Sequence, residues 1–331
     1  MSLRVCVFGA GAIGSWLGSR MARASARITL VTRGAHLDAI RTRGLEVQEG
    51  AESTLLDLKA IGPEEPVDRQ DIVFVTLKNH SVKGAAASIA RLCHANTTIV
   101  WAMNGIPWWF FHGMANESAS QGLDALDPSG AIAAWLDSSR VVGWVIYPSA
   151  ELVRPGCVRH TSGDRFLIGE PSGEPSRRIE TLHQLFRSSG LDARIVPDIR
   201  TQIWLKLWGN VAFNPLSVLT GATLKDLATD PGCRRVIKAM MSEAKAVAEA
   251  YGAKFEVDMD ARMDVARSVG PHRTSMLQDY EAGKPLETAA ILDAIIELAR
   301  RKSLSMPVST QVQGLLAMRV RVRDRAGIVR T

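Results

Sequence analysis

Residues 5–21 read VCVFGAGAIGSWLGSRM, and this stretch decides the fold class. An apolar strand pattern runs directly into a GxGxxG loop at the start of a helical pattern, and its glycines are Gly9, Gly11 and Gly14. In such a loop the first glycine allows a tight turn, the second lets a pyrophosphate approach the backbone, and the third packs helix on strand. The phosphates lie at the helix N-terminus, here Ala12 and Ile13. The stretch predicts a dinucleotide-binding βαβ unit, against the alternative of a glycine turn that serves packing alone.

Beyond this stretch, short β-branched runs alternate with helical patterns up to about Pro197. The expected strands of a parallel sheet lie at 3–8, 27–32, 71–77 and 97–101, with helices at 13–24 and 81–92. Shorter strands with Gly and Pro turns predict an antiparallel extension at 140–147, 156–160 and 165–168. After Asp198 only helical periodicity is found. The sequence predicts an α/β protein with a Rossmann-type doubly wound sheet in residues 1–197 and an all-helical domain in residues 198–331.

The composition excludes several classes of protein. A chain of 331 residues is longer than one hydrophobic core usually serves, and 46% hydrophobic with 22% charged residues is typical of a globular protein. The net charge of +6 would by itself suggest a polyanionic partner. Residues 319–331, however, contain five arginines against one aspartate, and we expect them to form a solvated tail after the last helix. We therefore expect no nucleic-acid partner.

The cysteines predict neither a metal site nor a disulfide framework. They lie 64 to 87 residues apart, with no CxxC pair, at Cys6, Cys93, Cys157 and Cys233. The first residues, MSLR, lead straight into the strand pattern without the regions of a signal peptide. The run 95–116 lacks acidic and basic residues but contains amides and a proline, which favours a buried strand and a loop over a membrane span. These features predict a cytoplasmic protein with no metal and no membrane partner.

The end of the second expected strand indicates which dinucleotide binds. Enzymes that use NAD usually carry Asp or Glu about 20 residues after the loop, whereas Arg accommodates the 2′-phosphate of NADP. The sequence here is ITLVTR, with Arg33 nineteen residues after Gly14 and no acid in that run. Arg33 therefore predicts NADP, with a solvated arginine at a strand end as the alternative.

Two further polar residues, Lys78 and Asn104, each follow an expected strand, in VTLK and WAMNG. Ligands of open α/β sheets bind at the carboxyl ends of the strands. An isolated lysine in this position is as often solvated. Together with Asn104 and Gly105, Lys78 becomes a candidate for contact with a ribose or with the substrate.

Three polar residues interrupt the apolar helical pattern TQIWLKLWGNVAFNPLSVLTG at 201–221. Lys206, Asn210 and Asn214 follow at intervals of four, so each lies about 40° further round a helix and all three line one side. Burying a lysine and two amides is costly unless partners are supplied. Such a stripe suits an anionic carbonyl substrate, and a network that binds the protein's own carboxylates is the alternative. Pro215 is expected to break the hydrogen-bond ladder after Asn214 and to kink the helix there.

Taken together, these segments resemble the ketopantoate reductase (2-dehydropantoate 2-reductase) family over nearly the whole chain. The segments that carry the resemblance are GAGAIG with Arg33, VTLK at Lys78, NG at Asn104, WLKLWGNVAFNPLSVLTG, and SMLQDYEAGKPLE from Ser275 to Glu287. The resemblance implies an oxidoreductase with a Rossmann domain and a helical domain that uses NADPH to reduce ketopantoate, a 2-oxo acid, to pantoate.

The resemblance also implies roles for single residues. Lys206 would be the general acid that protonates the ketone oxygen, and Glu287 would accept a hydrogen bond from the substrate's terminal hydroxyl. Lys78 and Asn104 would orient the nicotinamide ribose and the reacting carbonyl. The residues that would hold the substrate's carboxylate and hydroxyl groups are Asn210, Asn214 and Ser275. A lysine with an ordinary pKa of about 10.4 is protonated at neutral pH, and its charge stabilises a developing alkoxide.

Two departures from the family's pattern leave the substrate open. The segment after Asn104 contains WWFF at 108–111, and Glu287 is followed by TAAILDAI without a second acid. One alternative is a reductase of the same family that acts on a bulkier 2-oxo acid or an imine. Another is a non-catalytic NADP-binding sensor, against which the retention of Lys206 argues. For Ser275 and Glu287 a solvated surface position is the alternative, and whether the chain forms a homodimer stays open.

Overall fold

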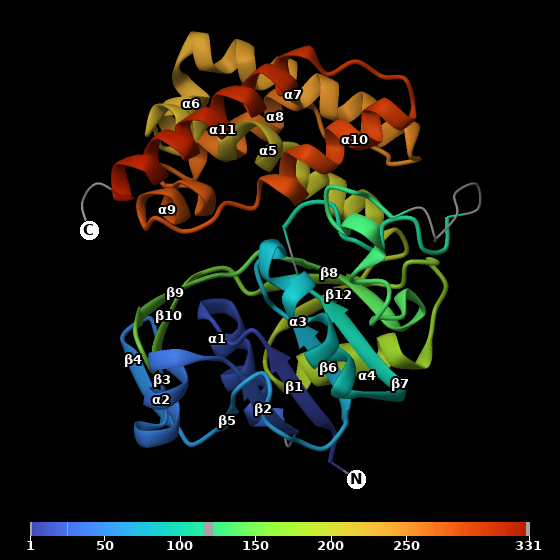
Figure 1. Cartoon of the computed structure of the whole chain (residues 1–331), viewed down its shortest axis with the longest axis vertical. Helices are drawn as coiled ribbons and strands as arrows, with labels where there is room; N and C mark the ends of the chain where they lie inside the picture. Colours follow the sequence, from blue (N-terminus) through green and yellow to red (C-terminus); the bar gives the residue numbers. More distant parts are fainter. Residues whose placement is uncertain (1, 25, 103, 115–121, 329–331) are drawn as a thin grey trace. The chain divides into compact units, whose positions relative to one another are not determined.

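The computed structural model describes residues 2–24, 26–102, 104–114 and 122–328, and the chain forms two compact units (Figure 1). The first unit comprises Met1–Met103, Trp109–Gly122 and Ser129–Ile199. The second comprises Asn104–Trp108, Leu123–Pro128 and Arg200–Thr331. Two short segments from the first half of the sequence, one of which begins at Asn104, therefore pack with the second unit.

The first unit is built on an eight-stranded sheet with the order β12-β11-β8-β7-β6-β1-β2-β5. Its strands are β1 (Arg4–Phe8), β2 (Arg27–Val31), β5 (Lys59–Ile61), β6 (Gln70–Val75), β7 (Cys93–Trp101), β8 (Val141–Ile146), β11 (Arg165–Gly169) and β12 (Asp192–Ile195). From β8 to β5 all neighbours pair in parallel, whereas β11 pairs antiparallel to β8. The predicted fold class is confirmed. The antiparallel extension was right only in part: β11 runs antiparallel to β8, but β8 continues the parallel order from β7, and residues 156–160 belong to a different sheet.

The helices of this unit arise from the crossovers between strands. They are α1 (Ala12–Met21), α2 (Gly34–Arg43), α3 (Asn79–Arg91) and α4 (Arg177–Ser188), with 3₁₀ turns η1 (Ala22–Ala24), η2 (Pro128–Gly130) and η3 (Ser138–Arg140). The chain passes from β1 through α1 to β2 in one direction across the sheet and from β6 through α3 to β7 in the other. Because such crossovers are right-handed, α1 and α3 cover opposite faces, which makes the sheet doubly wound.

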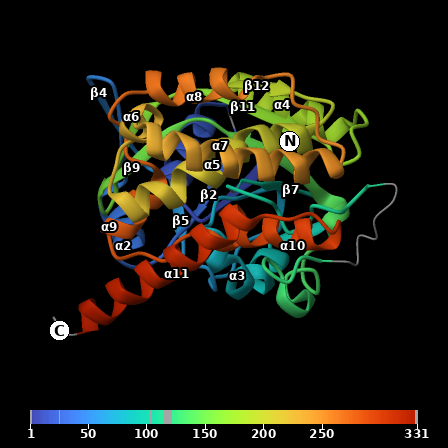
Figure 2. The ribbon, with the colours of Figure 1, turned by 90° about the horizontal axis from the view of Figure 1, so that it is seen from above.

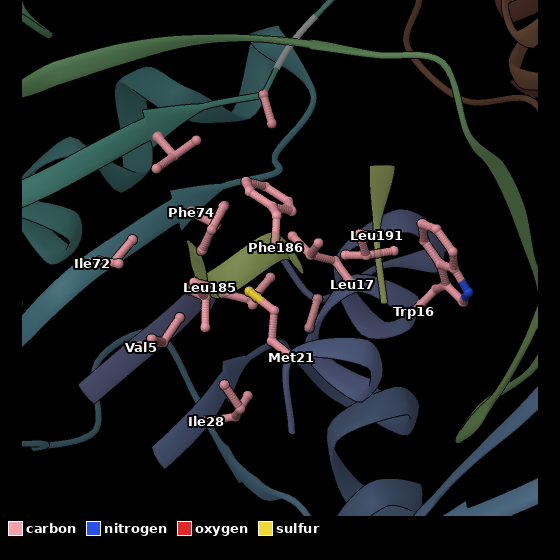
Figure 3. Packing of buried hydrophobic residues seen from close by; sticks show 14 of the residues in the cluster. Val5, Trp16, Leu17, Met21, Ile28, Ile72, Phe74, Leu185, Phe186 and Leu191 are labelled. Carbon is pink, nitrogen blue, oxygen red and sulfur yellow. The ribbon is translucent and has the colours of Figure 1, made fainter. Parts of the chain in front are cut away.

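An apolar core joins α1 and α4 to the sheet (Figure 3). Leu17 and Met21 of α1 and Phe186 of α4 are fully buried, and the ring of Phe186 meets that of Phe74 edge-on with centroids 5.8 Å apart. Each such side chain contributes about 1.5–3 kcal/mol by leaving water. This packing fixes α1, and with it the glycine loop at its N-terminus.

A second, four-stranded sheet packs on α1 and was not expected from the sequence. Its order is β4-β3-β10-β9, with β3 (Leu45–Glu49), β4 (Glu52–Leu56), β9 (Ser149–Arg154) and β10 (Cys157–Ser162). Trp16 of α1 donates from Nε1 to Glu49 Oε1 at 2.7 Å, and its ring stacks on His160 with centroids 4.4 Å apart. The second sheet therefore braces the helix that follows the glycine loop.

The second unit is helical throughout the residues that the structure describes, as predicted (Figure 2). Its elements are α5 (Ile199–Thr220), α6 (Leu224–Thr229), α7 (Pro231–Ala250), α8 (Met259–Ser268), α9 (Ser275–Glu281), the π-helical turn η4 (Ala289–Asp293), α10 (Ala294–Arg301) and α11 (Pro307–Ile328). Helices α5 and α7 lie side by side, where Trp208 Nε1 donates to the carbonyl of Met241 at 2.8 Å. Helix α5 continues through Pro215, which lies inside it.

Residues 319–328 belong to α11, so they do not form a tail after the last helix as expected, although most of them are exposed to solvent. Arg323 donates to the carbonyls of Tyr280 and Lys284 at 3.2 and 3.1 Å, and its guanidinium lies over the Tyr280 ring. These contacts anchor the C-terminal part of the helix. Within the described ranges, no helix is both long and apolar enough to cross a membrane, and no group of three or more metal-ligating side chains occurs.

Candidate active-site residues

The glycine loop has the geometry that a nucleotide needs. Gly9 has φ +103°, and a Cβ on it would lie 2.8 Å from Leu77 Cδ2. A Cβ on Gly14 would lie 2.6 Å from both the Gly9 carbonyl oxygen and Thr76 Oγ1. Gly11 differs, because its Cβ would find nothing nearer than the Gly9 oxygen at 4.0 Å. The first and third glycines are required by packing, whereas the second leaves open space for a ligand.

Helix α1 begins directly at this loop. Gly11 is its N-cap residue, no side chain caps the helix, and its first turn contains no acidic residue. Ala12 and Ile13 are half-buried in that turn. The N-terminal N–H groups and the helix dipole there favour an anion, so the residues present fit the pyrophosphate of a dinucleotide.

Arg33 and Lys78 lie at the same edge of the sheet as the loop. Arg33 follows β2 and is the exposed N-cap residue of α2, and Lys78 follows β6 and is the half-buried N-cap residue of α3. Both strands are parallel neighbours of β1. Two cations therefore flank the loop at the carboxyl ends of adjacent strands.

His36 joins three parts of this unit and was not identified from the sequence. Its Nδ1 accepts a hydrogen bond from the N–H of Gly156 at 2.9 Å, and its Nε2 lies 3.0 Å from Ser15 Oγ. Because the Ser15 hydroxyl donates to the Ala10 carbonyl, Nε2 carries the ring hydrogen and the ring is neutral. Burial lowers the pKa of His36, in agreement with a neutral ring. Helix α2, which carries Arg33, is thus tied to the glycine loop.

In the second unit, three of the predicted residues form a hydrogen-bonded group, here called the polar row: Lys206, Asn104 and Glu287. Lys206 Nζ donates to Asn104 Oδ1 at 2.9 Å, and Asn104 Nδ2 donates to Glu287 Oε2 at 3.4 Å. Glu287 is only 6% exposed, so the solvated alternative for it was wrong. A cationic proton donor, an amide and a carboxylate are thus brought together from α5, the segment after β7 and the residues before η4.

The two asparagines that follow Lys206 on α5 line the helix as predicted. Asn214 is buried and Asn210 is half-buried. Within the described part of the chain, neither side chain has a hydrogen-bond partner. Their amide groups are therefore available to hydrogen-bond a polar ligand.

Ser275 is exposed at the start of α9, and a buried pair of hydroxyls connects that helix to α5. Ser217 Oγ donates to the Asn214 carbonyl at 2.7 Å and lies 2.6 Å from Thr274 Oγ1. Thr274 is the N-cap residue of α9 and accepts from the Leu277 N–H at 3.1 Å. This pair sets Ser275 relative to Asn214. Sequence reasoning missed both hydroxyls, although Ser217 falls on the same side of the helical pattern as Lys206.

The aromatic run of residues 108–111 is buried. Trp108, Trp109, Phe110 and Phe111 are between 0% and 8% exposed. The rings of Phe110 and Phe111 meet edge-on with centroids 5.3 Å apart. These four residues pack in the interior.

Family models cover most of the chain. "Ketopantoate reductase PanE/ApbA" matches residues 5–173, and "Ketopantoate reductase PanE/ApbA C terminal" matches residues 198–320. The chain belongs to the ketopantoate reductase family. All candidate site residues of the ketopantoate reductase pattern lie inside the two matched ranges, and the resemblance stated from the motifs is confirmed.

Individual proteins of the ketopantoate reductase family are similar over nearly their full length. The 2-dehydropantoate 2-reductase of Mesorhizobium japonicum is 42% identical over 315 residues, which are 95% of this chain and 97% of that protein. A crystal structure from Ralstonia solanacearum MolK2, provisionally named a ketopantoate reductase, has a TM-score of 0.93 with 37% identity over 98% of this chain and 99% of its own. The 2-dehydropantoate 2-reductase of Geobacter metallireducens GS-15 has a TM-score of 0.82 with 26% identity over 96% and 99% of the two chains.

Proposed function

We propose that this protein reduces ketopantoate (2-dehydropantoate) to pantoate with NADPH. The observation that carries the proposal is the polar row, in which the Lys206 ammonium is hydrogen-bonded to Asn104 and Asn104 to the buried Glu287. The relative from Mesorhizobium japonicum, at 42% identity, is a 2-dehydropantoate 2-reductase, which supports the substrate class.

Reduction of a ketone needs a proton at the oxygen and stabilisation of the charge that develops there. Lys206 Nζ donates that proton, and its positive charge stabilises the alkoxide before the proton is transferred. Asn104 keeps the ammonium in place through its Oδ1. Glu287 accepts a hydrogen bond from the substrate's terminal hydroxyl. The amide and hydroxyl groups that bind the substrate's carboxylate are those of Asn210, Asn214 and Ser275.

NADPH, when bound, supplies the hydride. The open space at Gly11 and the uncapped N-terminus of α1 suit its pyrophosphate. Arg33, exposed at the end of β2, binds the 2′-phosphate, and Lys78 orients the nicotinamide ribose. Residues 1–197 are assigned to NADP binding, and residues 198–331 to substrate binding and catalysis, to which Asn104 is added.

We place the protein in the cytoplasm, with a small 2-oxo acid as its partner and no role for nucleic acid or membrane. A bulkier substrate gains no support from residues 108–111, because those aromatic side chains are buried.

The test is NADPH oxidation by the full chain with ketopantoate and a panel of aliphatic and aromatic 2-oxo acids. We expect the highest kcat/KM with ketopantoate. Lys206→Ala should lower kcat by about 10²–10⁴-fold and leave the Kd of NADPH unchanged. Absence of turnover with every acid would refute the proposal, and near-normal turnover by the variant would remove Lys206 from the mechanism.

A further inference from the structure

The orientation of the Asn104 side chain is set by its two neighbours in the polar row. Its Oδ1 accepts from Lys206 at 2.9 Å, and its Nδ2 donates to Glu287 at 3.4 Å. The reversed amide would direct its N–H groups at the ammonium and its oxygen at the carboxylate, which replaces two attractive contacts with two repulsive ones. Asn104 can make both hydrogen bonds only while its backbone keeps a fixed position relative to Lys206 and Glu287.

The next residue rests on another part of the chain. Gly105 has φ +87°, and a Cβ on it would lie 2.2 Å from the carbonyl oxygen of Ala290. Ile106 donates from its N–H to that same oxygen at 2.9 Å. The obstruction is backbone, so rotation of a side chain cannot relieve it. The turn from Asn104 to Ile106 therefore lies closer to Ala290 than any residue other than glycine would allow.

Ala290 belongs to the π-helical turn η4, which begins two residues after Glu287. Ile291 donates from its N–H to the Glu287 carbonyl at 3.2 Å, which ties Glu287 to the same turn. Single π-turns are rare and occur often at functional sites. The π-turn thus provides the carbonyl against which Gly105 packs, and it is hydrogen-bonded to Glu287, whose carboxylate Asn104 contacts.

We propose that Gly105 is a positioning residue, and that its contact with η4 sets the reach of Asn104 to Lys206 and Glu287. The inference rests on the proposed function, because it takes Lys206 as the proton donor. A methyl group at position 105 must lift the turn from Ala290 by on the order of 1 Å to restore an ordinary contact. A displacement of that size lengthens the two hydrogen bonds of Asn104 beyond useful range.

The primary test compares Gly105→Ala with Gly113→Ala. Gly113 also has a positive φ, +75°, but its Cβ would meet nothing nearer than 3.6 Å. Both variants carry the strain of alanine in this conformation, and only Gly105→Ala meets a backbone oxygen. We expect Gly105→Ala to lower kcat about 10²-fold with unchanged Kd for NADPH, and Gly113→Ala to keep nearly normal kcat. Equal losses of kcat in the two variants would overturn the inference.

A second variant does not depend on how alanine is accommodated at position 105. Asn104→Asp keeps the shape of the side chain and places a negative charge next to Lys206, while its second oxygen takes the place of the N–H that faces Glu287 and adds a negative charge there too. The added charge favours the protonated amine, so the basic limb of the pH profile of kcat should move upward by about one pH unit. If residue 104 had only a structural role, the basic limb of the profile would stay where it is. An unchanged basic limb would therefore argue against the contact between Asn104 and Lys206.

A third measurement needs no turnover. The titration of the Lys206 side chain can be followed by NMR of the full chain carrying ¹³C-labelled lysine, with Lys206→Arg to assign the signal. We expect Gly105→Ala to change this titration and Gly113→Ala to leave it as in the wild type. Identical titrations in all three proteins would overturn the inference. A changed titration in a protein that reduces no 2-oxo acid would refute the proposed function instead.

Discussion

The glycine loop of the first unit and the polar row of the second are built by opposite means. In the loop, the geometry depends on absent side chains, since a Cβ on Gly14 would lie 2.6 Å from the Gly9 oxygen. In the polar row it depends on present ones, since Lys206 is held by Asn104. The loop should therefore fail when atoms are added. The hydrogen-bonded groups of the second unit should fail when their own side-chain atoms are removed, and the polar row also when an atom is added at Gly105.

The largest effect on stability is expected from Gly14→Ala. The added methyl group meets the Gly9 oxygen and Thr76 Oγ1, each at 2.6 Å. Overpacking of this kind costs roughly 1–3 kcal/mol, which calorimetry should record as a fall in Tm of roughly 3–10 °C. Gly11→Ala is the matched control, because its methyl group enters open space: Tm should hold, and the affinity for NADPH should fall. Equal losses of Tm would contradict this division between the two glycines.

Arg33 lies beside the glycine loop but is expected to act through its charged side chain. Removal of that charge should therefore weaken the binding of the cofactor without disturbing the loop. Arg33→Ser should raise the Kd of NADPH by about 10–100-fold, the worth of one charge-assisted hydrogen bond to a phosphate, and leave the Kd of NADH unchanged. Fluorescence titration with both cofactors measures this. Arg43→Ser, at an exposed site on the same helix, serves as the control. A similar loss of affinity for NADPH and NADH would show that Arg33 does not bind the 2′-phosphate.

In the second unit, Ser217→Ala should be destabilising by about 1 kcal/mol, because the buried Thr274 hydroxyl and the Asn214 carbonyl each lose a partner. We also expect a higher KM for the 2-oxo acid, because Ser275 is no longer held relative to Asn214. Thr220→Ala is the control: its hydroxyl donates to the Leu216 carbonyl at 2.7 Å on the same helix but at an exposed position. Denaturant unfolding that finds the two variants equally stable would argue against the buried pair.

The smallest expected effect concerns pH and His36. Burial lowers the pKa of this residue in the folded protein below its ordinary value of about 6.5. The unfolded chain therefore takes up a proton first as the pH falls, and the native state loses stability below about pH 6.5. His36→Gln should lower Tm at pH 7.5, where the hydrogen bond from Gly156 matters, and this deficit should shrink at pH 5.5. The exposed His80→Gln is the control, and a deficit that does not depend on pH would argue against a neutral, buried ring.

Sequence patterns predicted those parts of the fold whose signals lie within a single stretch. The glycine loop, the strand before it and the stripe of polar residues on α5 are each visible in about 20 residues. The hydrogen bond between Lys206 and Asn104 spans 102 positions, and no local spacing predicts it. Only the resemblance to a family placed these two residues in one site.

The second sheet was missed for a related reason. Strand β3 pairs with β10, whose residues come more than a hundred positions later, and exposed strands such as β4 lack a buried alternating face. The length of helix α11 was underestimated because its arginines suggested a segment exposed to solvent beyond the helix. Arg323, at 17% side-chain exposure, in fact binds carbonyl groups at the end of α9.

The placement of Asn104 has a consequence for the order of events during synthesis. Asn104 and Glu287 are 183 residues apart in the chain. At ribosomal rates of about 5–20 residues per second, the turn at Gly105 leaves the ribosome roughly 10–40 s before the π-turn on which it rests. Throughout that interval the residues from Asn104 to Ile106 have no η4 to lie against, and the polar row can form only after Glu287 has been synthesised.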